Sequence, residues 1–474
     1  MQLTSLVKIL KKYLLKYWIT FWLIWPVVFS LAADDSSFDR QEFARQVKKM
    51  AEAALKEEKA YEFLKTLALP GGRLTGSPAA ARAVAQATDL MTQLGFDQVR
   101  QEPVEVNRWQ RGQTEKALVK SQKKGPHSLN ICALGNSIGT PSRGLEAEVL
   151  EIHSFDELEQ FQQAVKGKIV FFNIPMDRTE PNPFAAYGRA VPYRTNGASA
   201  AARYGAVAVL VRSLTFRLDD FPHTGLMIYD EQIPRIPAAA IATSQAEQLS
   251  QWLKEDPHLR VNLKMNSEQC PPVMSANVLG QLTGEEKPEE IILLGAHLDS
   301  WDLSPGANDD AAGCAVALEA LRLIKEAGWR PKRTIRAVLF MDEEFGGTGG
   351  RFYAASASRG SEKHLLAIEQ DNGGGPPVGL VLGGGAKIIE KAEKLEGILS
   401  QYGINWIRPG GGGVDIGPLI QQGTIAGGVV PETQRYFDFH HSALDQLSSV
   451  HPREIELQAI VLAIVSYYFS QEGI

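Results

Sequence analysis

Three apolar runs in the second half of the chain each end directly in side chains that can bind a divalent metal. The junctions are His297-Leu298-Asp299 after 291–296, Asp342-Glu343-Glu344 after 334–341, and Gln370-Asp371 after 365–369. The same residue types recur in Asn308-Asp309-Asp310 and in His440-His441 with the later Asp445. Carboxylates placed together repel one another and are costly to bury, so such a cluster needs a cation. Histidines combined with several carboxylates suit a pair of zinc ions that share a bridging carboxylate.

These junctions can meet only if the three apolar runs are neighbouring strands of one sheet. The runs alternate with helical patterns, notably 311–327 and 455–469, and this alternation predicts a largely parallel α/β sheet. Ligands of such sheets bind just beyond the carboxyl ends of the strands, so we expect these segments to converge in one crevice. A single acidic residue at a strand end is more often solvated or caps a helix. The repetition at successive strand ends is what favours a metal site.

The first half of the chain has a different organisation. Amphipathic helices are predicted over 38–67 and, with Ser77 as N-cap and Gly95 as stop, over 78–94. Residues 128–269 then combine short strands, one helix and long loops, without a cluster of histidine, cysteine and carboxylate side chains of their own. The strands are expected at 168–173, 206–211 and 236–241, the helix at 197–204, and the long loops at 181–187 and 221–228. We interpret 128–269 as a separate module.

The composition is that of a globular protein. The chain of 474 residues is 44% hydrophobic and 22% charged and has 3 cysteines, which excludes a disordered tail, a fibrous repeat and a disulfide-stapled miniature. We expect the cysteines to be mostly buried free thiols. With 49 basic and 55 acidic residues the formal net charge is −6, so no nucleic-acid partner is indicated.

The N-terminus has the pattern of a secretory signal peptide. Four lysines within residues 1–16 precede an apolar run over 17–29, and Ser30 and Ala32 suit cleavage after residue 32. The run is shorter than the roughly 20 residues that span a bilayer. We therefore predict a secreted, periplasmic or lumenal protein. The alternative is an uncleaved N-terminal anchor, which would be the chain's only contact with a membrane.

The order and spacing of the ligand-type segments resemble the co-catalytic zinc exopeptidases of the aminopeptidase and glutamate carboxypeptidase family. The segment Arg73-Leu74-Thr75-Gly76-Ser77-Pro78 matches an early motif of that family, and 128–269 resemble its inserted protease-associated domain. The resemblance implies an α/β fold with a mixed, largely parallel sheet flanked by helices and a β-rich insert. The expected parts are a signal peptide at 1–32, peptidase segments at 33–127 and 270–474, and the protease-associated insert at 128–269.

The resemblance also implies a role for each residue of the cluster. Asp309 would bridge two Zn²⁺ ions per chain, with His297 and Asp371 completing one site and Glu344 and His441 the other. Glu343 would be the general base that takes a proton from the metal-bridging water and returns it to the leaving amine. Asp299 and Asp445 would accept hydrogen bonds from the two imidazoles and fix their tautomers.

Three of these assignments separate adjacent residues of one type, and only the family pattern decides them. It selects His441 over His440 and Asp309 over Asp310, and it places the base Glu343 before the ligand Glu344. Asp310 is then expected to cap the following helix. The remaining histidines are predicted to be surface or packing residues: His127, His153, His223, His258, His364 and His451.

A glycine run at 410–413 precedes Val414-Asp415. It lacks the Gly-Lys-Ser/Thr ending of a phosphate-binding loop. The resemblance instead implies a flexible loop at the substrate pocket. The predicted pocket residues are His440, Gly412, Gly413 and Asp415.

The predicted function is zinc-dependent hydrolysis of dipeptides and other short peptides, because the likeness is strongest to a secreted carboxypeptidase branch that acts on dipeptides. Three alternatives share the fold: an aminopeptidase acting on longer peptides, a cyclotransferase with one zinc ion, and an inactive, receptor-like homologue that binds partners. The last is disfavoured because all five ligands and the base are in place. A homodimer is implied by the resemblance alone.

Overall fold

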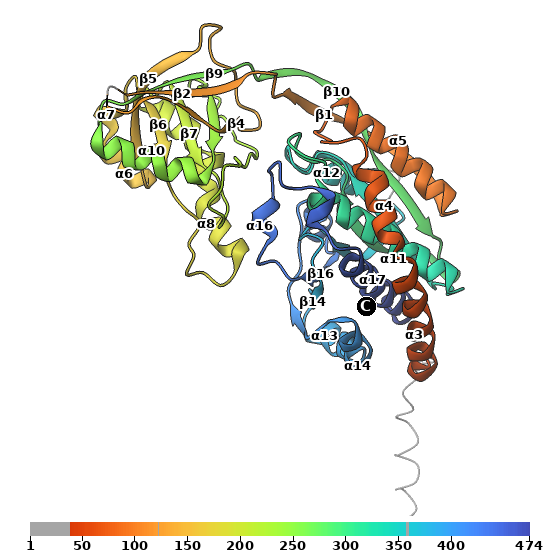
Figure 1. The fold of residues 1–474 in the computed structure, drawn as a ribbon. Coiled ribbons are helices and arrows are strands. Elements are labelled where there is room, and N and C mark those ends of the chain that lie inside the picture. The colour runs from red at the N-terminus through yellow and green to blue at the C-terminus, as the bar shows by residue number, and fades with distance from the viewer. Residues whose placement is uncertain (1–37, 122, 357–359) are drawn as a thin grey trace, which may run out of the picture. The chain divides into compact units, whose positions relative to one another are not determined.

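The computed structural model describes residues 38–121, 123–356 and 360–474 (Figure 1). The predicted signal peptide at 1–32 lies outside these residues. The chain divides into two compact units, Met1–Ala44 and Arg45–Ile474. In the first unit the described residues form the beginning of helix α3 (Arg40–Glu57), and the second unit contains both sheets.

The first sheet has eight strands in the order β1-β10-β12-β11-β13-β16-β14-β15. Their bounds are Asp97–Gln110 for β1, Glu268–Leu282 for β10, Arg333–Phe340 for β12, Lys287–His297 for β11, Lys363–Glu369 for β13, Ile425–Pro431 for β16, Pro377–Leu382 for β14 and Trp406–Pro409 for β15. The central strands β12, β11, β13 and β16 are parallel. Strand β10 is antiparallel to both β1 and β12, and β14 is antiparallel to β16 but parallel to β15. The predicted mixed, largely parallel α/β sheet is therefore confirmed.

Helices cover this sheet, which explains the continuous apolar runs of its central strands. Residues 291–294 of β11 are completely buried. Helices α11 (Ala312–Glu326) and α17 (Pro452–Glu472) lie side by side next to α4 (Lys59–Ala68) (Figure 1). The other helices of this part are α5 (Pro78–Gln93), capped by Ser77, α12 (Thr348–Ala355), α13 (Ala386–Glu393), α14 (Glu396–Leu399), α15 (Gly417–Gln421) and α16 (Tyr436–Phe439).

A buried pair of acids joins these helices. Glu456 of α17 and Glu319 of α11 are both fully buried and hydrogen-bond to each other. Arg322 binds both oxygens of Glu319, at 2.6 and 2.7 Å. Glu456 accepts the Ala60 backbone N–H of α4 at 3.0 Å. Burial, and then the charge of Glu319, raises the pKa of Glu456 to about 9, so that Glu456 carries the shared proton at neutral pH.

This shared proton predicts a pH-dependent stability. Because the folded-state pKa of Glu456 is raised, its stabilising contribution is complete below the unfolded-state value near 4.5 and is lost as the pH rises through about 9. We expect the melting temperature of the wild type to fall over that range and that of Glu456→Gln, which keeps a donor toward Glu319 and cannot ionise, to fall less. If the melting temperatures of the two proteins fell equally across this pH range, the shared proton would be contradicted.

The second sheet also has eight strands, in the order β3-β2-β9-β5-β6-β7-β8-β4. Their bounds are Gly125–Leu129 for β3, Glu115–Ser121 for β2, Arg260–Met265 for β9, Leu145–Ile152 for β5, Ile169–Phe172 for β6, Ala208–Arg212 for β7, Ala238–Ile241 for β8 and Ile131–Ala133 for β4. The accompanying helices are α6 (Phe155–Gln160), α7 (Gln162–Val165), α8 (Pro183–Thr195), α9 (Gly197–Arg203) and α10 (Thr243–Glu255) (Figure 1). The chain enters this sheet after β1 and leaves it before β10, at the paired residues Gln110 and Glu268. We call residues 111–267 the insert.

Two expectations about the insert differ from the structure. The boundary placed at residue 128 falls within β3, because β2 and β3 already pair within the second sheet. The loop expected at 181–187 contains the start of α8, where the Asn182 side chain caps the N–H groups of Phe184 and Ala185 and Pro183 occupies the first turn. The identification of the insert as a protease-associated domain stays a prediction.

Cys132, Cys270 and Cys314 are free thiols, and the first and last are buried. Among the described residues, no helix combines the length and the apolar composition needed to cross a bilayer.

Candidate metal centre

The predicted ligands come from the carboxyl ends of neighbouring strands. His297 is the last residue of β11, Glu344 follows β12 and Asp371 follows β13. Asp309 lies in the segment Ala307–Ala311 that leads into α11, where its own backbone is not helical, and His441 follows α16. The parallel order of β12, β11 and β13 brings the three strand ends to one edge of the sheet.

His297, Asp309 and Asp371 form the first cluster. The Nε2 atom of His297 lies 3.1 Å from Asp309 Oδ1 and 3.5 Å from Asp371 Oδ1. One ligand atom from each residue lies within 4.8 Å of the other two, which is the spacing of donors that can hold one metal ion. These are the three residues that the family resemblance assigned to one of the two zinc sites.

Asp309 also faces a second cluster with its other oxygen. The Nε2 atom of His441 lies 3.5 Å from Asp309 Oδ2 and 3.0 Å from Glu344 Oε2. Asp309 thus directs Oδ1 toward His297 and Oδ2 toward His441. A carboxylate with one oxygen in each of two donor groups has the geometry of a bridging ligand.

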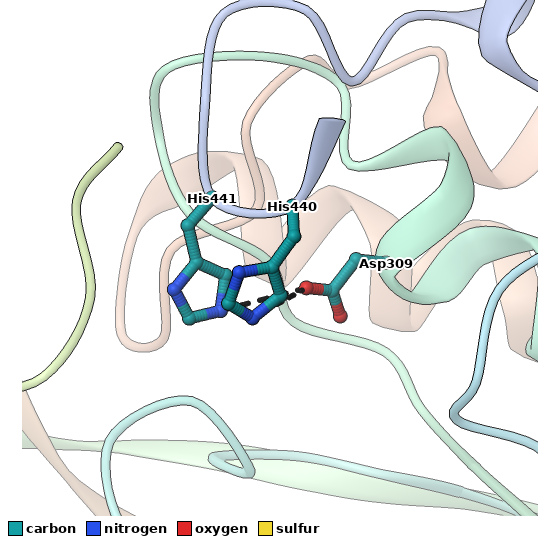
Figure 2. Close-up of side chains that lie close together, drawn as sticks. All are labelled: Asp309, His440 and His441. Carbon is teal, nitrogen blue, oxygen red and sulfur yellow. Dashed lines mark ion pairs between the residues drawn. The ribbon is translucent and has the colours of Figure 1, made fainter. Parts of the chain in front are cut away.

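His440 lies beside His441 and faces the same oxygen. Its ring stacks on that of His441 with centroids 3.5 Å apart, and its Nε2 atom is 3.9 Å from Asp309 Oδ2 (Figure 2). His441 is nearer to Asp309 and also reaches Glu344. Ligand atoms of Asp309, His440 and His441 nevertheless all lie within 4.8 Å of one another, so the choice of His441 over His440 as the ligand stays a prediction.

The surroundings of the donors fit a cation such as zinc. Asp309 is 4% exposed and Glu344 is 6% exposed, and Glu344 Oε1 has no hydrogen-bond partner among the described residues. Burial, and then the charge of Asp309, raises the pKa of Glu344 well above its ordinary value. Burial alone would lower the pKa of His297, but the adjacent carboxylates of Asp309 and Asp371 raise it well above its ordinary value. Buried carboxylates that repel one another beside imidazole nitrogens are stabilised by a divalent ion, so this set of side chains suits such an ion.

Asp299 positions the turn that carries the predicted base and its neighbour. Its carboxylate accepts the backbone N–H groups of Asp342 at 2.9 Å, Glu343 at 3.2 Å and Glu344 at 3.3 Å. The Nδ1 atom of His297 lies 3.0 Å from the backbone oxygen of Asp299, compared with 3.8 Å from its carboxylate. Asp299 is therefore the acceptor for the His297 ring, as predicted, but through its backbone carbonyl. The Asp299 carboxylate instead accepts the backbone N–H groups of the Asp342–Glu344 turn.

Asp445 likewise binds backbone groups. It accepts the N–H of Asn308 at 2.6 Å and the N–H of Asp309 at 3.1 Å, so it holds the segment that carries the bridging residue. The expectation that Asp445 would accept from His441 is corrected, because His441 Nδ1 lies 3.3 Å from the carbonyl oxygen of Thr224 in the insert. Asp310 accepts the N–H of Gly313 at 3.0 Å, as expected of a helix cap.

A buried acid, Asp415, follows the predicted pocket loop. Gly412 and Gly413 are exposed, but Asp415 is 1% exposed, and neither of its carboxylate oxygens has a hydrogen-bond partner in the part of the chain that is described. Burial, and then the neighbouring Glu369, raises the pKa of Asp415 well above its ordinary value. Asp415 is therefore buried, and its place at a substrate pocket stays a prediction.

Two contributors to the site were not identified from the sequence. The hydroxyl of Tyr436 hydrogen-bonds to the carboxylate of Asp309. Burial would raise the pKa of Asp309, but the two histidines beside it and this hydroxyl hold it below its ordinary value. The second contributor is the insert, through His223 and Thr224. The aromatic pair Tyr436-Phe437 just before the histidines was the available signal for the first, whereas no local signal marks the second.

Comparison with known proteins is consistent with this geometry. Residues 277–465 match the model of peptidase family M28. Carboxypeptidase Q of Bos taurus is 36% identical over 412 residues, which cover 87% of this chain and 85% of that protein, and carboxypeptidase Q of Homo sapiens gives the same values. The resemblance seen in the sequence, including the likeness to this carboxypeptidase branch, is therefore confirmed.

Solved structures agree with these relatives. A peptidase M28 precursor from Shewanella amazonensis SB2B superposes with a TM-score of 0.86 at 32% identity, covering 91% of this chain and 97% of that one. A zinc aminopeptidase from Bacillus subtilis has a TM-score of 0.62 at 21% identity, covering 86% of this chain and 94% of that one, and shares the fold.

Proposed function

From the premise that this chain belongs to peptidase family M28, we propose that it is a zinc metallo-exopeptidase that hydrolyses dipeptides and short peptides with two zinc ions per chain. The observation that carries the proposal is the position of Asp309, which directs one carboxylate oxygen to His297 and the other to His441. A cofactor of one ion would leave half of this donor set without a role.

In this proposal His297 and Asp371 hold one ion, His441 and Glu344 hold the other, and Asp309 contacts both. When bound, the ions would lower the pKa of a water molecule, polarise the scissile carbonyl and offset the charge of the surrounding carboxylates. The five side chains would fix the positions of these charges before substrate arrives. Such preorganised charge is usually the largest contribution to catalysis of acyl transfer.

Glu343 is proposed as the general base. Its carboxyl is partly buried next to the cluster, where burial, and then the charges around it, raises its pKa well above the ordinary value. Asp299 fixes its backbone through the N–H bond at 3.2 Å. Glu343 would take the proton from the attacking water and deliver it to the nitrogen of the leaving group.

The substrate class follows from the relatives. Proteins named carboxypeptidase Q match over most of their length, which supports exopeptidase action. We further propose that His440 contacts the substrate, since its buried ring stacks on His441 at the edge of the cluster. The exposed glycines Gly412 and Gly413 are proposed to form the mobile rim of the pocket.

The proposal predicts a specific pattern of hydrolysis. Purified protein should cleave members of a library of free dipeptides, lose this activity in the presence of a strong chelator, and regain it when zinc is restored. The reason is that activation of the water and polarisation of the scissile carbonyl would both require the metal. Aminoacyl p-nitroanilides, which report aminopeptidase action, are expected to be poor substrates. The reverse preference would identify an aminopeptidase, and failure to cleave any peptide with zinc restored would refute the proposal.

Location and assembly remain proposals as well. We propose that residues 1–32 are removed as a signal peptide and that the mature enzyme acts outside the cytoplasm, because four lysines before a short apolar run and Ser30 and Ala32 before the cut have that pattern. A homodimer is proposed from the family resemblance. The net charge of −6 gives no support to a nucleic-acid partner.

A further inference from the structure

The insert contacts the pair His440-His441 of the metal centre through main-chain and side-chain groups. Thr224 donates its backbone N–H to the carbonyl of His441 at 2.9 Å, and its own carbonyl oxygen lies 3.3 Å from His441 Nδ1. The preceding residue, His223, directs Nδ1 to the carbonyl of His440 at 2.7 Å. Two consecutive residues of the insert therefore hold two consecutive residues of the centre, from positions 217 residues apart in the sequence.

These contacts determine which nitrogen of His441 is free. A carbonyl oxygen can only accept a hydrogen bond, so the Nδ1 atom that faces Thr224 must carry the hydrogen. The Nε2 atom of the neutral ring then presents its lone pair toward Asp309 and Glu344. A hydrogen bond of this kind behind a ligating histidine sets both the tautomer and the direction of the ring.

His441 needs such support because its backbone is in an unusual conformation. Its φ is +60°, in the left-handed region that residues with a side chain seldom occupy. The bond from Thr224 N–H to the His441 carbonyl and the bond from His223 to the His440 carbonyl hold the two peptide groups on either side of the His441 Cα. The insert thus supports both the conformation of this dipeptide and the ring of His441.

The two insert residues are themselves firmly held. Thr224 is 1% exposed, and its hydroxyl donates to the carbonyl of Ala133 at 2.9 Å while accepting from Arg111 at 3.3 Å. Arg111 in turn forms an ion pair with Asp302 at 2.6 Å, and Asp302 lies shortly after His297 in the sequence. His223 receives support through its backbone N–H, which donates to the hydroxyl of Ser213 at 2.9 Å.

An apolar seam connects the insert to the helix that precedes the histidines. Tyr187 of α8 stacks on Phe437 of α16 with centroids 4.6 Å apart. The seam has one buried cluster, formed by Met176, Ala186, Ala190 and Leu214 of the insert with Tyr436 and Phe437. The position of α16, and hence of His441, therefore depends on packing against the insert.

We infer that the insert is a working part of the metal centre, in which the Thr224 carbonyl orients the His441 imidazole and His223 fixes the backbone that carries it. This inference rests on the proposed function, since it requires that His441 bind metal. Thr224 and His223 are positioning residues, because they act on the metal through His441. His223, which the sequence predicted to be a surface or packing residue, would thus have a positioning role.

The test compares two identical substitutions within the insert. Thr224→Val removes the hydroxyl that anchors the carbonyl and keeps the side-chain shape. Thr243→Val is the matched control, because Thr243 is also fully buried and its hydroxyl also donates to carbonyls, those of Arg217 at 2.9 Å and Asp219 at 3.3 Å, which are not part of the His440-His441 pair. Zinc bound per full-length chain is measured against a series of zinc-buffered solutions, and the melting temperature is recorded for each protein.

Both variants are expected to lose similar stability, since each loses a buried hydrogen bond. Only Thr224→Val should bind one of its two zinc ions more weakly, because the carbonyl behind His441 loses its anchor; the expected loss is up to about 10- to 100-fold, the usual effect of disturbing a hydrogen-bonding partner behind a metal ligand. Equal zinc binding by the two variants would overturn the inference while leaving the proposed function intact. A wild type that binds no zinc at all would overturn both.

A second pair of variants covers the case in which Thr224→Val does not fold. His223→Asn places an amide N–H near the position of Nδ1 and can still donate to the His440 carbonyl, whereas His223→Leu cannot. The inference expects His223→Asn to retain two zinc ions and His223→Leu to lose affinity for one of them. Identical zinc binding in this pair would exclude a positioning role for His223.

Discussion

Replacing Glu343 by glutamine is expected to reduce kcat for a dipeptide by about 10²- to 10⁴-fold while leaving the bound zinc unchanged. Glutamine has nearly the shape of glutamate but cannot accept a proton from water. The backbone bond from residue 343 to Asp299 does not depend on the side chain and should persist. The variant should therefore separate proton transfer from metal binding.

The measurement has two parts, kcat with saturating substrate and zinc content by elemental analysis. Glu286→Gln provides the matched control, since Glu286 is an exposed residue paired with Lys332 at 3.7 Å and such pairs contribute little. The control should keep wild-type values for both measurements. If Glu343→Gln retained most of its turnover, another residue would be the base, and if it lost zinc, Glu343 would be a ligand.

The ligand cluster could be predicted because its residues are tied to strand ends. Apolar runs predict strands, parallel strands align their carboxyl ends, and side chains such as His297 and Asp371 follow these ends directly. The first sheet could be predicted for the same reason. The choice of Glu343 over Glu344 required the family pattern, since chemistry assigns similar properties to adjacent glutamates.

The partners of the ligands could not be predicted, because they depend on backbone turns. Asp342 and His441 have φ values of +78° and +60°, and such left-handed conformations at residues other than glycine have no clear sequence signal. These turns direct Asp299 and Asp445 to backbone N–H groups and not to the imidazoles. Asp415 illustrates the same limit: it is buried directly after an exposed glycine run, in which Gly413 lies against the side chain of Glu369.

The contribution of the insert is a matter of tertiary structure alone. Thr224 lies in a region predicted to be a loop, and its carbonyl is a main-chain group that no residue type reveals. Tyr187 falls at the end of the segment expected to be a loop and is part of α8, which packs against α16. Contacts between distant segments arise from the packing of the two parts, and periodicity along the chain carries no information about them.

Asp309→Asn is expected to have the largest effect on metal binding, with zinc per chain falling well below one ion and peptidase activity falling to background. Asp309 is the only residue common to both clusters, with Oδ1 facing His297 at 3.1 Å and Oδ2 facing His441 at 3.5 Å among the described residues. Asparagine keeps the size but removes the charge and replaces one oxygen by an N–H donor. Both donor groups therefore lose a carboxylate oxygen or its charge in a single substitution.

A thermal readout makes this prediction independent of activity. A ligand that binds only the folded state raises its stability by RT ln(1 + [L]/Kd), so zinc should raise the melting temperature of the wild type and a chelator should lower it. The melting temperature of Asp309→Asn should barely respond to either. Its zinc-free form should be less stable than that of the wild type, because the adjacent histidines lower the pKa of Asp309 and the ionised carboxylate therefore stabilises the zinc-free fold.

The control for this variant is Asp97→Asn, an exposed position whose side-chain oxygen accepts the backbone N–H of Thr283 at 3.0 Å and can do so equally as an amide. It should show the full response to zinc. A zinc-dependent rise in melting temperature that survives in Asp309→Asn would mean that the clusters hold their ions without a shared carboxylate. A zinc-free form as stable as that of the wild type would instead show that the two adjacent histidines do not stabilise the Asp309 charge.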